Sequence, residues 1–310
     1  MSVGARLDRD TWAILVAFVL MALAWLMPPL DLMQRTYDNI VVFDITQSMN
    51  VEDYELQGSP VSRLTYAKAA VADALHRLPC GSRVGFAVFA EYRTLLLLAP
   101  IEVCGNYNDL LATLNNIDGR MRWGNASQVA KGTFWALRVA KEIEPRPNVL
   151  FMSDGQEAPP LDTQEIPLFD DLKTGEVHGW IMGVGGDIPR PIPKTDSQGR
   201  PLGYWHPEDV VQLEGSQGPQ SQEHLSSVRE PYLRALADQT GLGFTRLQGF
   251  DSVAKVLSGS REARERRVPT DMDWLPLGIA LLLLALRFRP DVSPASVPFL
   301  GRWGETFWRN

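Results

Sequence analysis

Hydroxyl and carboxyl side chains alternate directly after an apolar segment near residue 40. The segment 40–43 reads Ile-Val-Val-Phe, and Asp44, Thr46 and Ser48 follow it at alternate positions. Hard divalent cations such as Mg²⁺ prefer oxygen ligands and keep several bound waters, so hydroxyls combined with a carboxylate acting through water suit such an ion. The spacing therefore predicts a strand that ends in a metal-binding loop.

Two more oxygen-bearing side chains are expected at the same place. Asp154 follows a second apolar segment, 148–153, and Ser127 stands where a helix is predicted to begin. Taken singly, Ser127 is also typical of a helix N-cap and Asp154-Gly155 of a turn. Thr133 is an alternative to Ser127, but it falls in the apolar stripe of the predicted helix. The predicted ligands of Mg²⁺, or alternatively of Ca²⁺ or Mn²⁺, are Asp44, Thr46, Ser48, Ser127 and Asp154.

The elements that would position these residues alternate between strands and helices. Strands are predicted at 39–43, 83–89, 94–99, 148–153, 177–184 and 243–245, and helices at 64–78, from about 127, at 230–239 and at 251–257. Continuous apolar strands that alternate with amphipathic helices predict an α/β fold with a doubly wound, mostly parallel sheet. In such sheets ligands bind beyond the carboxyl ends of the strands, where Asp44 and Asp154 are expected. A Pro-, Gly-, Gln- and Ser-rich insert at 187–229 interrupts the alternation and is expected to hang over the same edge, as a functional or a disordered segment.

The only two cysteines lie at equal distances from a predicted hairpin turn. The turn is expected near residue 92, and Cys80 and Cys104 are each twelve residues from it. Equidistant positions of an antiparallel hairpin face each other, so we predict a disulfide between them, which requires an oxidising compartment. Two unrelated buried cysteines are the alternative.

Both ends of the chain are apolar. Residues 12–30 contain no charge and predict a retained membrane anchor, with a cleaved signal peptide as the alternative. Residues 274–288 predict a second membrane segment, with a buried core helix as the alternative. The basic cluster at 261–267 is expected to be the solvated face of a helix, or to contact lipid headgroups. The tails are 1–11 and 289–310. With two spans the middle of the chain lies outside the cytoplasm, which predicts a bacterial inner-membrane protein with a periplasmic domain.

Composition excludes several functional classes. Thirty Lys+Arg residues against 37 Asp+Glu residues give a net charge of −7, which argues against nucleic-acid binding. Two cysteines and four scattered histidines do not form a zinc site of the usual spacing.

The metal-binding pattern resembles a known family. Asp44-x-Thr46-x-Ser48, Ser127 and Ser153-Asp154-Gly155 resemble the metal-ion-dependent adhesion site of von Willebrand factor type A (VWA) domains, over about residues 39–258. The resemblance implies that Thr46, Ser48 and Ser127 bind the metal directly and that Asp44 and Asp154 act mainly through water. Thr46 replaces the more common Ser of the family, and Ser127 the more common Thr, and both keep the hydroxyl.

A narrower resemblance concerns membrane-anchored bacterial VWA proteins of MoxR-ATPase operons, of the Bat type and nearest to MxaL-type accessory proteins of methanol oxidation. It is carried by the strings at 123–132, 151–160 and 183–205. It implies a role in the assembly or maturation of a periplasmic metalloenzyme. One example of such a role is the loading of calcium into methanol dehydrogenase. The implied partners are a MoxR-type ATPase system and other VWA membrane proteins.

Two functions are compatible with the aspartates. The preferred one is a binding module in which an Asp or Glu of a partner protein completes the coordination of the metal. The alternative is a metal-dependent, phosphatase-like hydrolase that uses Asp44 and Asp154. Phosphatases of the haloacid dehalogenase type place a second acid two residues after the nucleophile, and here that position is Thr46, which cannot act as a general acid/base at neutral pH. We therefore expect no enzymatic activity.

Overall fold

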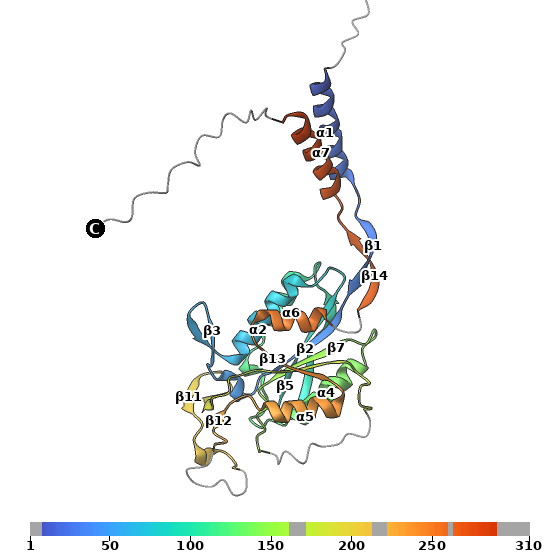
Figure 1. Cartoon of the computed structure of the whole chain (residues 1–310). Coiled ribbons are helices and arrows are strands. Elements are labelled where there is room, and N and C mark those ends of the chain that lie inside the picture. Colours follow the sequence, from blue (N-terminus) through green and yellow to red (C-terminus); the bar gives the residue numbers. More distant parts are fainter. Residues whose placement is uncertain (1–7, 161–171, 213–221, 260–262, 290–310) are drawn as a thin grey trace, which may run out of the picture. The chain divides into compact units, whose positions relative to one another are not determined.

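The chain forms two units that are described separately. The computed structural model describes residues 8–160, 172–212, 222–259 and 263–289 (Figure 1). The larger unit is Met33–Val268, and the smaller unit combines Met1–Leu32 with Pro269–Asn310.

A six-stranded sheet forms the centre of the larger unit. Its strands stand in the order β13-β8-β7-β2-β5-β6. Their bounds are β2 (Asp38–Asp44), β5 (Arg83–Ala90), β6 (Arg93–Glu102), β7 (Asn148–Ser153), β8 (Gly179–Gly183) and β13 (Gly243–Arg246). All neighbouring strands are parallel except β5 and β6, which form an antiparallel hairpin. The predicted, mostly parallel α/β sheet is confirmed.

Helices cover both faces of this sheet, since its central strands are apolar on both sides. Along β2, Val41 and Phe43 pack into one core cluster, while Ile40 and Val42 pack into the other. The first cluster includes helices α2 (Arg63–Arg77), α3 (Tyr107–Asn116) and α6 (Phe250–Ser258), and the second includes α4 (Val129–Lys141) and α5 (Glu230–Thr240). In Figure 1, α2 and α6 lie above the sheet and α4 and α5 below it. The helices predicted from apolar spacing are present, and α3 is an additional one.

Close packing of α4 against β5 depends on a glycine. A Cβ at Gly132 would lie 2.2 Å from the nearest ring carbon of Phe89, on β5. The absence of a side chain at residue 132 therefore lets the helix approach the strand, which brings the start of α4 to the carboxyl edge of the sheet.

The predicted disulfide is present. Cys80 and Cys104 are bonded, with their Cα atoms 5.3 Å apart. They flank the hairpin of β5 and β6, and residue Glu91 at its turn has a positive φ of 57°. The prediction that two cysteines equidistant from the hairpin turn face each other is therefore confirmed.

The described part of the basic cluster, from residue 263 onward, is not a helix face, so the prediction is wrong for that part. Within the described residues it belongs to strand β14 (Arg264–Thr270), which pairs with β1 (Leu30–Thr36). Exposure alternates along β14, as expected for a strand with one side covered. Arg266 is bound to Asp38, the first residue of β2, at 2.5 Å. Pairing with β1 and this ion pair override the helical interpretation of the charges.

The smaller unit contains two apolar helices, α1 (Arg9–Leu26) and α7 (Trp274–Arg287). By length and composition α1 is long and apolar enough to cross a membrane, whereas α7 has only 14 residues. Small residues, Ala17, Ala24 and Ala280, are buried in this unit, while most of the large apolar side chains of both helices are exposed. The C-terminal tail at 290–310 lies outside the described residues.

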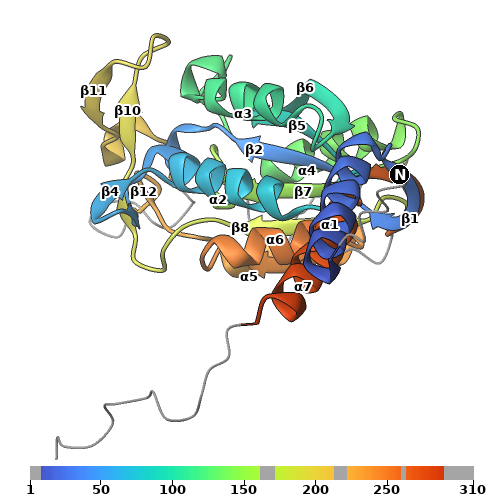
Figure 2. The ribbon, with the colours of Figure 1, turned by 90° about the horizontal axis from the view of Figure 1, so that it is seen from above.

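The insert contains ordered elements in its described parts. They are β9 (Arg190–Pro191), β10 (Pro193–Thr195), β11 (Pro201–Tyr204), the short helix η3 (Pro207–Asp209) and β12 (Leu225–Ser226). β10 pairs with β11 and β9 with β12, both antiparallel. Figure 2 shows β10 and β11 at the carboxyl end of β2, the edge at which the sequence predicts the site.

Candidate metal centre

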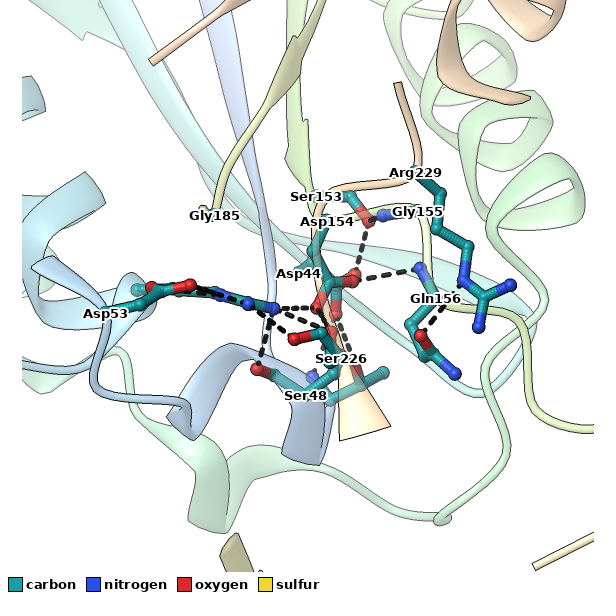
Figure 3. Close-up of polar contacts among 12 residues, drawn as sticks. Asp44, Ser48, Asp53, Ser153, Asp154, Gly155, Gln156, Gly185, Ser226 and Arg229 are labelled. Atoms are coloured by element: carbon teal, nitrogen blue, oxygen red, sulfur yellow. Dashed lines mark hydrogen bonds and ion pairs between the residues drawn. The ribbon is translucent and has the colours of Figure 1, made fainter. Parts of the chain in front are cut away.

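The loop after β2 holds two hydroxyls beside a buried carboxylate (Figure 3). Asp44 is the last residue of β2 and is fully buried. The backbone N–H and the hydroxyl of Thr46 both donate to Asp44 Oδ1, at 2.9 and 2.6 Å. The hydroxyls of Thr46 and Ser48 are 3.2 Å apart, because the short helix η1 (Gln47–Asn50) turns the chain directly after Thr46. These distances agree with the expectation, from the spacing, that the side chains of Asp44, Thr46 and Ser48 lie close together.

The loop after β7 brings a second carboxylate to the same edge. Register between β2 and β7 places Phe43 opposite Met152, so Asp44 lies next to Ser153, whose hydroxyl donates to Asp44 Oδ2 at 2.6 Å. Asp154 follows and is also fully buried. Its Oδ1 accepts the backbone N–H of Gln156 at 3.0 Å.

Burial and mutual repulsion make it costly to ionise both aspartates, Asp44 and Asp154. Burial, and then the negative charge of Asp154, raises the pKa of Asp44 to about 7, although hydrogen bonds from Ser153 and Thr46 oppose the shift. A carboxylate that is costly to ionise in the absence of a counter-charge is stabilised by a cation, since the cation favours the charged form.

Asp154 is paired with an arginine that the sequence analysis did not identify. Arg63 Nη1 donates to Asp154 Oδ2 at 2.7 Å, and Arg63 also binds Asp53 at 2.7 Å. The Arg63 side chain is 0% exposed and that of Asp53 is 3% exposed. Burial opposes the charge of Arg63, but Asp154 and Asp53 outweigh that effect and hold its pKa above the usual range.

Ser226 and Gly185 are further neighbours of Arg63. The hydroxyl of Ser226, at the end of the insert, lies 2.7 Å from Arg63 Nη1 and 2.9 Å from Asp154 Oδ2. Gly185 has a φ of +129°, and a Cβ there would lie 2.8 Å from Arg63 Nε. One sequence signal could have indicated this role: Arg63 opens α2, where a positive charge opposes the helix dipole and therefore needs another partner.

The hydroxyl of Ser127 is buried and has no hydrogen-bond partner among the described residues. The backbone of Ser127 pairs with that of Ala158, with both N–H···O distances 2.8 Å, and this pairing fixes Ser127 two residues before the start of α4 at Val129. Thr133 is different: its hydroxyl donates to the carbonyl of Val129 within α4, at 2.9 Å. Ser127, unlike Thr133, thus keeps a free oxygen beside the loop that carries Thr46 and Ser48.

A cavity of about 230 Å³ opens above these hydroxyls. Thr46, Ser48 and Ser127 contribute to its lining. The other lining residues come from the loops beside the site and from the insert, and are Gln47, Asn125, Gln156, Glu157, Ala158, Pro159, Pro160, Ile192, Trp205, Asp209, Val210, Val211 and Glu223. The site is therefore reached through a recess with one wall formed by the insert.

The insert is hydrogen-bonded to the loop after β2. Gln47, between Thr46 and Ser48, accepts the backbone N–H of Thr195 and the indole N–H of Trp205, each at 3.0 Å. Its amide nitrogen donates to Asn125 at 2.8 Å. The sequence analysis placed the insert near this edge but did not identify Gln47 as its attachment.

Known proteins agree with this description at the level of the domain. Residues 40–156 match the family model of the von Willebrand factor type A domain. The chain therefore contains a VWA domain, with the α/β fold of that class and a mostly parallel central sheet. No curated protein matches the chain.

Similar solved structures include three bacterial proteins. An aerotolerance-related membrane protein from Bacteroides fragilis, carrying multiple mutations to serine, is 15% identical, with a TM-score of 0.46, over 72% of this chain and 97% of that one. The conserved hypothetical protein BatB from Bacteroides thetaiotaomicron is 17% identical, with a TM-score of 0.48, over 72% and 96%. An uncharacterized membrane-spanning protein from Vibrio fischeri is 19% identical, with a TM-score of 0.29, over 70% and 93%.

Proposed function

We propose that this chain is a membrane-anchored VWA protein that binds a divalent cation and uses it for metal-dependent interaction with a protein partner. The ligands would be Asp44, Thr46, Ser48, Ser127 and Asp154, with Mg²⁺ as the preferred ion and Ca²⁺ or Mn²⁺ as alternatives. The observation that carries the proposal is the buried hydroxyl of Ser127, which has no hydrogen-bond partner among the described residues. It lines the same cavity as the hydroxyls of Thr46 and Ser48.

The donor set fits a hard cation. Thr46, Ser48 and Ser127 supply neutral oxygens, and the carboxylates of Asp44 and Asp154 lie behind them, fully buried. Arg63 already neutralises part of the charge of Asp154. A divalent ion bound there would keep residual positive charge and an open coordination position that an Asp or Glu of a partner can fill.

The helices of the smaller unit support a membrane anchor. Their large apolar side chains face outward, with Trp25 89% and Leu281 73% exposed, while small residues are buried. Such an inverted distribution is favoured in hydrocarbon, where small residues let helices pack closely. We propose α1 as the anchor and α7 as a second membrane segment. At ~1.5 Å per residue α7 measures only about 21 Å, so it would rely on Arg287 extending to the interface.

The cellular setting is proposed from the sequence resemblance and from the disulfide. The bond between Cys80 and Cys104 favours an oxidising compartment, and hence a periplasmic domain at the bacterial inner membrane. The resemblance to MxaL-type and Bat-type proteins supports a role in assembly of a periplasmic metalloenzyme, such as a methanol dehydrogenase. A MoxR-type ATPase system and other VWA membrane proteins are the proposed partners.

A hydrolase is the second candidate, because two buried carboxylates, Asp44 and Asp154, lie behind the hydroxyls that line a cavity. Thr46 occupies the position of the second acid of haloacid dehalogenase-type phosphatases, and its hydroxyl is bound to Asp44. No base is hydrogen-bonded to the hydroxyl of Ser127 among the described residues, so a nucleophile activated by a neighbouring base is not present there. The geometry thus favours binding.

The test separates metal binding from partner binding. The tagged full-length chain is purified from its own membranes with Mg²⁺ or with EDTA, beside Asp44→Asn and a matched control, Asp109→Asn, which changes an exposed acid on α3. Partners are expected with Mg²⁺ in the wild type and the control only. Partners retained in EDTA and with Asp44→Asn would refute the proposal.

Ser127→Ala tests the ligand set directly. The hydroxyl makes no hydrogen bond to the described residues, so its removal is expected to leave the unfolding free energy nearly unchanged. The affinity for Mg²⁺, measured by calorimetry, should fall at least about tenfold, because a direct ligand is lost. An unchanged affinity would exclude Ser127 from the site.

A further inference from the structure

Another buried acid, Glu157, lies in the cavity wall and takes no part in the proposed metal site. Glu157 is 6% exposed. Its Oε1 accepts the backbone N–H of Ala130, near the start of α4, at 3.3 Å, and also the hydroxyl of Tyr232 on α5. Its Oε2 is buried and has no hydrogen-bond partner among the described residues. One oxygen therefore holds two helices together, and the other is left unused.

The buried charges of this region do not balance. Asp44, Asp53, Asp154 and Glu157 supply four carboxylates against the single guanidinium of Arg63, which leaves a charge of −3 when all are ionised. A divalent metal ion reduces this to −1, and the carboxylate of a partner that binds the metal would return it to −2. Uncompensated buried charge is costly, so the bound complex calls for another positive charge.

Neighbouring acids in the cavity wall are already paired. Asp209 is bound to Lys194 at 3.2 Å, and Glu223 to Arg229 at 2.8 Å. Among the described residues that line the cavity none is basic. Burial raises the pKa of Glu157 to about 7, against the hydrogen bond from Tyr232 and the weaker effect of the charge of Lys131. Glu157 is thus the acid of this wall that lacks an ion-pair partner among the described residues.

Part of the cavity wall is apolar, and the cavity is small. Ile192, Trp205, Val210 and Val211 come from the insert, and Pro159 adds to them from the loop after β7. The volume of about 230 Å³ is below the ~300–1,000 Å³ typical of small-molecule sites, so the recess suits one long side chain. Lysine and arginine combine an aliphatic stem, which packs on apolar walls, with a terminal cation.

We propose that this cavity receives a lysine or arginine side chain of the same partner protein whose acidic residue reaches the metal, with the cation placed at Glu157. The inference rests on the proposed function, because it assigns a specificity site beside the metal. The partner would therefore present an acidic and a basic residue close together. The insert, through Trp205 and its neighbours, supplies the surface for the basic residue's stem.

A peptide library tests the specificity. Phage displaying random heptapeptides with a fixed central Glu are selected on the full-length chain in lipid nanodiscs, with Mg²⁺ and with EDTA. The wild type is expected to enrich Lys or Arg at least threefold at one position flanking the Glu, in Mg²⁺ only. Glu157→Gln, which keeps the size and most hydrogen bonds, should still capture Glu peptides without basic enrichment. Glu142→Gln, an exposed acid after the far end of α4, is the matched control.

The outcomes separate this inference from the proposed function. Mg²⁺-dependent capture of Glu peptides with Leu or Met enriched instead of Lys or Arg would overturn the inference and leave the proposed function standing. Absence of any Mg²⁺-dependent capture would overturn the proposed function, and with it the pairing of acidic and basic residues.

A second measurement examines the cation site alone. n-Butylguanidinium is titrated into the full-length chain with ¹³C-labelled isoleucine methyls, and the Ile192 signal reports on the cavity. Glu157→Gln is expected to weaken binding at least fivefold, while Glu142→Gln does not change it. Equal binding to the Glu157→Gln variant would overturn the inference whatever the library shows.

Discussion

Replacement of Arg63 by methionine should destabilise the domain strongly in the absence of metal. Arg63 is fully buried between Asp53 and Asp154, with both carboxylates at 2.7 Å. Methionine has an unbranched stem that reaches about as far as Arg63 Nε but supplies no charge, so the two carboxylates lose their shared counter-ion. Removing one partner of a buried ion pair costs about 3–5 kcal/mol. We expect a loss of this size for Arg63→Met.

The same variant should respond more strongly to Mg²⁺ than the wild type. A cation beside Asp154 replaces part of the charge that Arg63 supplied, so the ion is expected to restore a part of the lost stability. The measurement is urea unfolding of the full-length chain in detergent, followed by tryptophan fluorescence, in EDTA and at saturating Mg²⁺. Arg77→Met is the matched control, because Arg77 lies on the same helix and pairs with Asp73 and Asp251 at the surface, where ion pairs contribute little.

Two results would refute this reasoning. A loss below about 1 kcal/mol in EDTA would mean that the acids do not need the guanidinium, since it would lie far under the cost of an uncompensated buried charge. An equal effect of Mg²⁺ on both proteins would mean that the ion does not lie near Asp154.

Three further predictions follow from particular contacts. The pKa of about 7 leaves Asp44 mostly protonated at about pH 6 and mostly ionised at about pH 8, so the apparent Mg²⁺ affinity should rise about tenfold over that range in calorimetry; a flat profile would contradict this. Gly132→Ala should cost ~1–3 kcal/mol in urea unfolding, because the added carbon overlaps the ring of Phe89; no loss would show that α4 can shift freely. Replacing Cys80 and Cys104 by serine opens a loop with a sequence separation of 24 and should cost about 3–4 kcal/mol, with a smaller loss indicating a compact unfolded state.

Elements with long, regular patterns were predictable from the sequence. The strand 148–153 is apolar throughout, because both of its faces are covered by helices, and its bounds agree with β7. The disulfide was predictable because its two positions are related by a single turn. The loop after β2 was also predictable, since its alternate oxygen-bearing side chains lie within residues 44–48, directly at the end of one strand.

Contacts between distant segments were not predictable in the same way. Arg63 looks like an ordinary basic residue of a helix, and only the fold brings it to Asp154 and Ser226. The sequence favours a helix for the basic cluster near residue 264, because consecutive charged residues do not show the alternation of apolar and polar residues that is typical of a strand. Pairing with β1, more than 220 residues away, decides the structure there.

The pairing of β9 with β12 has a consequence for engineering. Pro191 lies opposite Leu225, and Arg190 lies opposite Ser226. The segment 192–224 of the insert therefore begins and ends at neighbouring positions of the domain. A two-residue Asn-Gly turn can join such antiparallel ends. The segment 192–224 can thus be excised as a module while Ser226 keeps its place beside Arg63, and the same junction can accept the corresponding segment of another protein.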